Sequence, residues 1–315
     1  MLILSISLLT KIFDKLPNCE NWSLQLLRIN NSKKNGISYA TRQIELTPNN
    51  KLHDYVWNIS KRYTKGRDSF SETFINVIDY DGSTIGNVIY KLNFENILIS
   101  EALNKLLAAI SDPDVEANPL EFSPQAYIVK GNIMVDEKEI NVKLISMNKP
   151  LTTLRNKYIL KIYKTSQFEE ITDQVLSLRN AFDVIIIDNN IYFLTLAAEK
   201  LFNLEHTYRK ICEEKVNLIC DKNLISDNDN FKKIASSGHN PRKFISFNDK
   251  GLSFLENETI LTDLAPKFSL IIKNGKIDTS DEKTSQNLIK LLCRKGMEDP
   301  FEHIAVEVES AKTWN

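Results

Sequence analysis

The sequence predicts an α+β protein with mixed, largely antiparallel sheets, packed helices and two domains. Extended apolar segments occur in pairs joined by tight turns, which suits antiparallel strands. Amphipathic helical segments lie between these pairs without the regular strand–helix alternation of a parallel sheet. A chain of 315 residues is also longer than one core of ordinary size requires.

Three strand pairs can be read from turn residues between apolar runs. The expected pairs are 126–135 with 139–147 around a charged turn, 183–188 with 191–194 around Asn189-Asn190, and 268–273 with 276–277 around Asn274-Gly275.

Four helices are predicted from apolar periodicity and start signals. Their expected starts are Thr47-Pro48, Ser100, Ser166 with Glu169 in capping-box spacing, and Thr279 with Glu282 in the same spacing. Gly296 is a candidate end for the last helix.

The segment Ser111–Pro124 is the predicted linker. It contains three prolines and four acidic residues and has little periodicity. We therefore expect an N-terminal α+β domain over 1–115 and a second domain over 122–315.

Forty basic and forty-one acidic residues leave a net charge of −1. Attraction to nucleic acid would therefore require a local cationic patch. The four cysteines are far apart and match no common zinc-site spacing, so buried free thiols in a reducing compartment are expected. No run approaches eighteen apolar residues, which predicts a soluble, cytoplasmic protein.

Most enzyme signatures are absent, including phosphate-binding glycine loops and histidine metal motifs. No catalytic residue, cofactor or metal site is predicted. One enzymatic alternative is a metal-dependent nuclease, since three triplets carry two acids followed by lysine. These triplets are Asp136-Glu137-Lys138, Glu213-Glu214-Lys215 and Asp281-Glu282-Lys283. Each triplet also has a non-catalytic explanation, namely a hairpin turn, a solvated helix face and a first helical turn, and such triplets arise by chance in a chain that is a quarter charged.

Basic segments supply candidate contacts to a phosphate backbone. The stretch 149–164 contains no acidic residue and has tyrosines among its cations, and a second group follows near residue 240. The candidate DNA-binding residues are Lys149, Arg155, Lys157, Lys161, Lys164, Lys232, Lys233, Arg242 and Lys243. The C-terminal stretch 298–309 is acidic instead, and we expect it to avoid nucleic acid and to suit a basic partner.

The run FDVIIIDNNIYFLTLAAEKLFNLEHTYRKICEEKVNLI and the closing ESAKTWN resemble the KwaB family of the bacterial Kiwa anti-phage system, over roughly residue 122 to the end. The resemblance implies a defence protein that binds phage DNA without sequence specificity and blocks its replication or expression. It also implies a membrane partner of the KwaA type, which would hold the protein at the inner membrane.

The leading hypothesis is therefore a DNA-binding effector that forms a homodimer or larger homo-oligomer, in which repeated weak patches act together. The alternatives are the nuclease and an adaptor that binds its membrane partner without contacting DNA.

Overall fold

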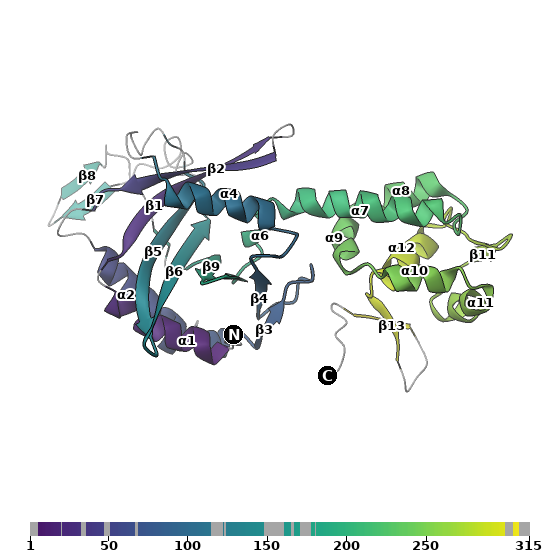
Figure 1. The fold of residues 1–315 in the computed structure, drawn as a ribbon, viewed down its shortest axis with the longest axis horizontal. Coiled ribbons are helices and arrows are strands. Elements are labelled where there is room, and N and C mark those ends of the chain that lie inside the picture. Colours follow the sequence, from purple (N-terminus) through teal and green to yellow (C-terminus); the bar gives the residue numbers. More distant parts are fainter. Residues whose placement is uncertain are drawn as a thin grey trace. The chain divides into compact units, whose positions relative to one another are not determined.

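The fold was analysed in a computed structural model, which describes residues 6–19, 21–32, 36–46, 51–66, 69–114, 122, 124–147, 161–164, 167–170, 178–179, 181–299 and 305–308. For 161–164 and 167–170 only the backbone is described. The chain divides into two compact units (Figure 1). Unit 1 comprises residues 1–79 and 87–203, and unit 2 comprises residues 80–86 and 204–315.

Unit 1 is built on one eight-stranded sheet, which confirms the predicted α+β class. Every neighbouring pair is antiparallel except β3 with β4. In spatial order the strands are β2 (Gly36–Ile44), β1 (Ser23–Ser32), β5 (Ala126–Val135), β6 (Lys138–Met147), β9 (Val184–Ile187), β10 (Asn190–Phe193), β4 (Val88–Asn93) and β3 (Asn76–Asp79).

Helices cover both faces of this sheet. Leu24, Val129 and Leu144 share one face by register and pack in the core with α1 and α2. On the other face, Gln25 and Thr41 hydrogen-bond to carbonyls at the end of α4. The helices of unit 1 are α1 (Ile6–Lys15), the 3-10 turn η1 (Leu16–Asn18), α2 (Leu52–Lys65), α3 (Phe70–Thr73), α4 (Ser100–Ser111) and α6 (Ala198–Leu201).

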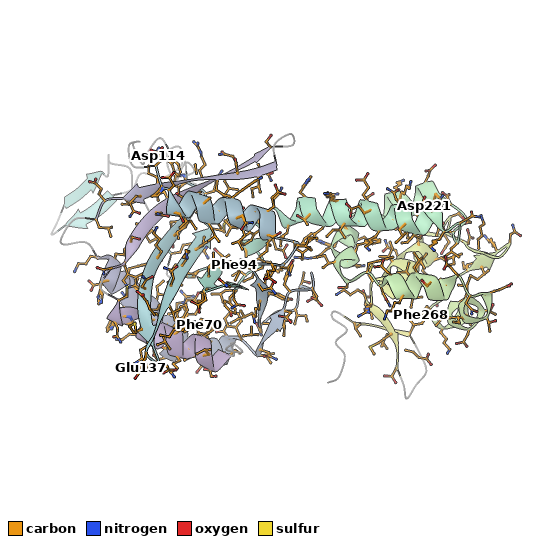
Figure 2. The ribbon with its side chains drawn as sticks, viewed as in Figure 1. Phe70, Phe94, Asp114, Glu137, Asp221 and Phe268 are labelled. Carbon is orange, nitrogen blue, oxygen red and sulfur yellow. The ribbon has the colours of Figure 1, made fainter. Side chains whose placement is uncertain are left out.

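All three predicted hairpins are present, one of them with a shifted turn. Asp136 and Glu137 form the β5–β6 turn with positive φ, and Glu137 marks its tip in Figure 2. The second hairpin turns at Asp188-Asn189, one residue earlier than predicted, because Asn190 pairs with Ile187 in the ladder. Asp188 accepts the left-handed conformation that this turn requires, with φ +50°.

The predicted linker Ser111–Pro124 falls inside unit 1. Strand β1 precedes it and β5 follows it, yet the two strands pair directly, from Ser23 with Lys130 to Leu27 with Ala126. The chain passes between the two units at 79/80, 86/87 and 203/204 instead.

The predicted helix from Ser166 is wrong at its start. Residues Gln167–Glu170 form strand β8, which pairs with β7 (Lys161–Lys164) as a separate two-stranded sheet. Backbone pairing with the preceding segment has overridden the capping-box spacing. The predicted start at Thr47-Pro48 lies outside the described residues, and the helix that follows is α2.

Unit 2 is mainly helical and has its own apolar core. Its elements are α7 (Leu204–Asp221), α8 (Asn228–Ala235), α9 (Asn240–Lys243), the 3-10 turn η3 (Phe244–Ser246), α10 (Asp249–Leu255), α11 (Glu258–Lys267), β11 (Ile272–Lys273), β12 (Lys276–Ile277), α12 (Glu282–Leu292), β13 (Gly296–Glu298) and β14 (Ala305–Glu307). The N-cap of α12 is Asp281, which accepts from the Thr284 amide, and not Thr279. The helix ends at Leu292, before Gly296.

The loop Tyr80–Gly86, which joins β3 to β4 in sequence, packs within unit 2. The Tyr80 hydroxyl hydrogen-bonds to the Tyr208 hydroxyl of α7 and accepts from Arg242 Nη2 at 3.3 Å. Ser246 Oγ donates to the Asp81 carbonyl at 3.1 Å. Within the described ranges, no helix combines membrane-spanning length with sufficient apolarity.

Candidate nucleic-acid interface

Helices α7, α8 and α9 gather five cations in unit 2, which we call the basic surface: Arg209, Lys232, Lys233, Arg242 and Lys243. Lys232 and Lys233 lie in the last turn of α8, and both are exposed. Among the described residues, neither ammonium group has a carboxylate within 4.0 Å. These two lysines are therefore positioned to meet an external anion.

Arg242 and Lys243 are half-buried and take part in the packing of unit 2. The Arg242 guanidinium lies 5.5 Å from the centre of the Tyr208 ring and donates to Tyr80. Lys243 Nζ donates to Asn240 Oδ1 at 3.1 Å. Burial and the hydrogen bond with Tyr80 raise the pKa of Tyr208, which keeps this hydroxyl protonated. Arg242 therefore stabilises the Tyr80–Gly86 loop as well as adding positive charge.

Arg209 of α7 was missed by the sequence analysis. Its guanidinium donates to Glu205 Oε1 at 3.0 Å and to the Ser236 carbonyl at 3.4 Å. This second contact connects α7 to the segment that follows α8, across 27 residues of sequence. An arginine within a charged helical segment, here next to Lys210, gives no local sign of such a contact.

A pocket of about 350 Å³ lies at this junction of helices. Its lining residues are Arg209, Cys212, Glu213, Val216, Asn217, Lys232, Ser236 and Pro241. The Cys212 thiol is buried, which raises its pKa to about 11, and it donates to the Ala235 carbonyl. The pocket thus has two cations and one carboxylate above an apolar floor.

The remaining predicted contacts are mostly outside the described residues. This applies to Lys149, Arg155 and Lys157. Lys161 and Lys164 are the end residues of β7, and the register places Lys161 opposite Glu170 and Lys164 opposite Gln167. The acid-free run in the sequence therefore has an acidic neighbour across its hairpin.

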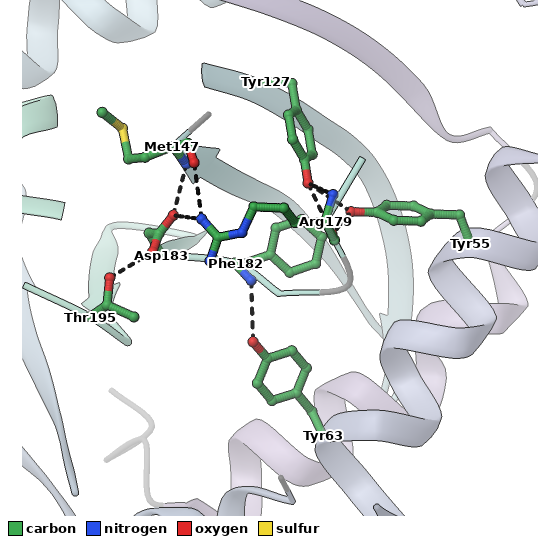
Figure 3. Close-up of polar contacts among 8 residues, drawn as sticks. All are labelled: Tyr55, Tyr63, Tyr127, Met147, Arg179, Phe182, Asp183 and Thr195. Atoms are coloured by element: carbon green, nitrogen blue, oxygen red, sulfur yellow. Dashed lines mark hydrogen bonds and ion pairs between the residues drawn. The ribbon is translucent and has the colours of Figure 1, made fainter. Parts of the chain in front are cut away.

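Asp183 joins Met147, the last residue of β6, to Arg179 (Figure 3). This buried carboxylate accepts from the Met147 amide at 2.8 Å, Thr195 Oγ1 at 2.6 Å and Arg179 Nη1 at 3.4 Å. Arg179 Nη1 also donates to the Met147 carbonyl at 3.0 Å. The chain therefore leaves the sheet and returns to it at one point.

Two tyrosines fix the returning chain from the other side (Figure 3). The Tyr127 hydroxyl accepts from the Arg179 amide at 2.7 Å and lies 2.9 Å from the Arg179 carbonyl. The Tyr55 hydroxyl donates to that carbonyl at 2.5 Å, and burial is the main cause that raises its pKa. This cluster fixes the backbone of Arg179 against the sheet and against α2.

Each acid triplet lies where its non-catalytic explanation expects it: in a hairpin turn, on an exposed helix face or at the start of a helix. Asp136 lies in the β5–β6 turn and pairs with Lys11 at 2.5 Å. Glu213 and Glu214 are exposed on α7, and Asp281 caps α12. Within the described parts of the chain, no three His, Cys, Asp or Glu side chains gather closely enough to hold a metal ion.

The acidic C-terminal stretch is partly neutralised inside unit 2. Glu298 lies 3.3 Å from Lys267, and Glu307 lies 2.8 Å from Lys290. The other three acids that define the stretch are Asp299, which has an interaction within the protein, and Glu302 and Glu309, which lie outside the described residues.

These observations define an α+β protein of two units with a basic helical surface on one of them. A family model described as Kiwa protein KwaB-like matches residues 132–295, just over half of the chain. The chain belongs to this family, which confirms the resemblance and assigns it a role in Kiwa anti-phage defence. The match begins within β5 of unit 1 and ends in unit 2. No curated protein and no solved structure matches the chain.

Proposed function

We propose that the protein is a defence effector that binds duplex DNA without sequence preference through the basic surface and blocks phage DNA replication or expression. One observation carries the proposal: Lys232 and Lys233 are adjacent, exposed and without a carboxylate partner among the described residues. Contacts of this kind bind phosphates and cannot distinguish bases, so the binding should be blind to sequence.

The proposal includes partners that its family suggests. A membrane protein of the KwaA type would hold the protein at the cytoplasmic side of the inner membrane, and a homodimer or larger homo-oligomer would repeat the basic surface. Repetition supports DNA binding by a chain of net charge −1, because linked weak sites bind more tightly than one.

Binding to unrelated linear duplexes across a salt series tests the proposal. Each lost phosphate contact reduces the slope of log K against log salt by about 0.9. Lys232→Gln with Lys233→Gln should therefore weaken binding to every duplex alike and reduce the slope by about 1.8. Glutamine removes the charge and is only one atom shorter than lysine, so most of the packing is retained.

The matched control is Lys15→Gln with Lys250→Gln, which makes the same charge change at two exposed lysines elsewhere. Lys15 is also in the last turn of a helix, α1. Equal binding by the two folded double variants would refute the assigned surface. No wild-type binding at low salt would favour the adaptor, and cleaved DNA in the presence of Mg²⁺ would favour the nuclease.

A further inference from the structure

The pocket beside the basic surface has a defined order of polar groups. Arg209, Glu213 and Asn217 follow one another at intervals of one turn along α7, on the side that faces α8. Arg209 contacts the carbonyl of Ser236, which fixes that end of the pocket.

The opposite end of the pocket holds Lys232. Cys212 of α7 meets Ala235, one residue before Ser236, so the two helices run antiparallel here. Lys232 precedes Ser236 by one turn of α8 and therefore lies alongside Val216 and Asn217. The two cations are thus at opposite ends, and Glu213 is between them.

The size and lining of the pocket limit its ligand. Its volume of about 350 Å³ is near the lower end of the roughly 300–1,000 Å³ range of ligand sites, which suits one small molecule. Val216 and Pro241 are buried and form an apolar floor, which suits a flat ring or a sugar.

The charged side chains of the pocket determine which chemical groups the ligand should carry. Lys232 has no carboxylate partner among the described residues, so it is available to an anion such as a phosphate. Glu213 is exposed and likewise has no cation within 4.0 Å in the described part of the chain. An ionised carboxylate only accepts hydrogen bonds, so it favours a ligand with an amino group.

We propose that this pocket binds one nucleotide: its phosphate on Lys232, its base between the Arg209 guanidinium and the apolar floor, and an exocyclic amino group toward Glu213. Guanidinium planes are common stacking partners of unstacked bases. Asn217, an exposed residue alongside Lys232, is placed to contact the sugar or the phosphate. The site therefore prefers bases that carry an exocyclic amino group, such as adenine and cytosine, over thymine, which has none.

The nucleotide has two possible sources with the same chemistry, an unpaired nucleotide of a DNA strand or a free nucleotide. The inference rests on the proposed function only through Lys232, which the pocket shares with the basic surface. Sequence-blind duplex binding and nucleotide binding can therefore succeed or fail separately.

Isothermal titration calorimetry of the full chain tests the site. The ligands are 5′-dAMP, 5′-dCMP, 5′-dTMP and inorganic phosphate. The two amino-bearing nucleotides should bind about threefold to tenfold more tightly than dTMP, the value of one ordinary hydrogen bond that replaces water, because Glu213 is exposed to solvent. Glu213→Gln should abolish that preference. Asn217→Trp, which fills the rim of the pocket, should weaken all nucleotides by about tenfold or more.

Neighbouring residues on α7 supply the controls. Glu214→Gln and Leu218→Trp make the same changes at exposed positions outside the lining and should leave nucleotide affinity within about twofold. A blunt duplex and one with a deoxyadenosine overhang identify the source. If the wild-type protein binds the overhang duplex more tightly and Asn217→Trp abolishes that difference, the pocket holds an unpaired nucleotide of a strand. If the wild-type protein binds both duplexes equally, the pocket holds a free nucleotide.

The inference is overturned if wild-type protein binds no mononucleotide, if inorganic phosphate binds as tightly as dAMP, or if Asn217→Trp matches Leu218→Trp. Should duplex binding persist in any of these cases, the proposed function stands and only the pocket assignment fails. Circular dichroism of each variant confirms that an observed loss reflects the site and not unfolding.

Discussion

Replacing Asp183 with alanine should destabilise unit 1 more than any exposed carboxylate substitution. The side chain is almost fully buried, with 3% of its surface exposed, and accepts from three donors. Removing it deprives the part-buried Met147 amide and the hydroxyl of Thr195, an exposed residue, of their acceptor. A buried donor that loses its partner costs its full desolvation free energy.

The magnitude follows from the geometry. The bonds from Met147 and Thr195 are 2.8 and 2.6 Å long, and a hydrogen bond to a charged group contributes about 1.5–3 kcal/mol. Arg179 is about half exposed and its contact is 3.4 Å, so solvent screening holds that ion pair below about 1 kcal/mol. Water can replace the acceptor of the exposed Thr195, so Asp183→Ala should reduce the free energy of unfolding by about 2–4 kcal/mol.

Urea unfolding followed by tryptophan fluorescence measures the effect, because Trp22 and Trp57 lie in unit 1. With a typical slope of about 1–3 kcal/mol/M, the midpoint should fall by about 1 M or more. Thr195→Val, which removes one donor and keeps the side-chain shape, should cost about 1–2 kcal/mol. Glu101→Ala, at an exposed ion pair of α4, should cost less than about 1 kcal/mol. A loss below about 1 kcal/mol for Asp183→Ala would refute the anchoring role.

Two further predictions concern unit 2. The ion pair of Lys273 with Asp278, at 2.5 Å, and the hydrogen bond from Ser280 hold the pKa of Asp278 at about 2. The stability that this carboxylate contributes should be present above its unfolded pKa of about 4 and be lost as pH falls from about 4 to 2. Acid titration of unfolding should show this dependence, and Lys273→Met should flatten it; an unchanged profile would exclude the pair as its cause. In addition, all four cysteines are buried, so Ellman's reagent should modify none of them rapidly in native protein and all four in denaturant. Rapid modification of any native thiol would contradict the packing.

The elements that could be predicted from sequence are those defined by local chemistry. The β5–β6 hairpin follows from alternating apolar residues around a charged turn, and the apolar side of α4 follows from Leu103, Leu106 and Ile110. The prediction was wrong where a local helix signal competed with strand pairing. Ser166 and Glu169 have capping-box spacing, but pairing with β7 places Gln167–Glu170 in a strand.

The arrangement of the chain in two units could not be predicted because it depends on contacts distant in sequence. The proline-rich segment after α4 has the composition of a linker, yet β1 and β5 pair across it. Nothing near Tyr80 indicates that it pairs with Tyr208, 128 residues away. The candidate site shows the same limit: Lys232 and Lys233 stand out as adjacent charges, whereas Arg209 and Asn217 join the pocket only through helix packing.

The contact between Tyr80 and Tyr208 has a consequence for synthesis on the ribosome. Its two residues are separated by 128 positions, and bacterial chains grow by roughly 5–20 residues per second. Tyr80 therefore waits about 6–26 s for Tyr208 to be made, and somewhat longer for Arg242. Over that interval the flanking strands β3 and β4 can pair, whereas the loop between them has no partner. Unit 2 is thus the last part of the protein that can be completed, and it is completed around a loop made long before it.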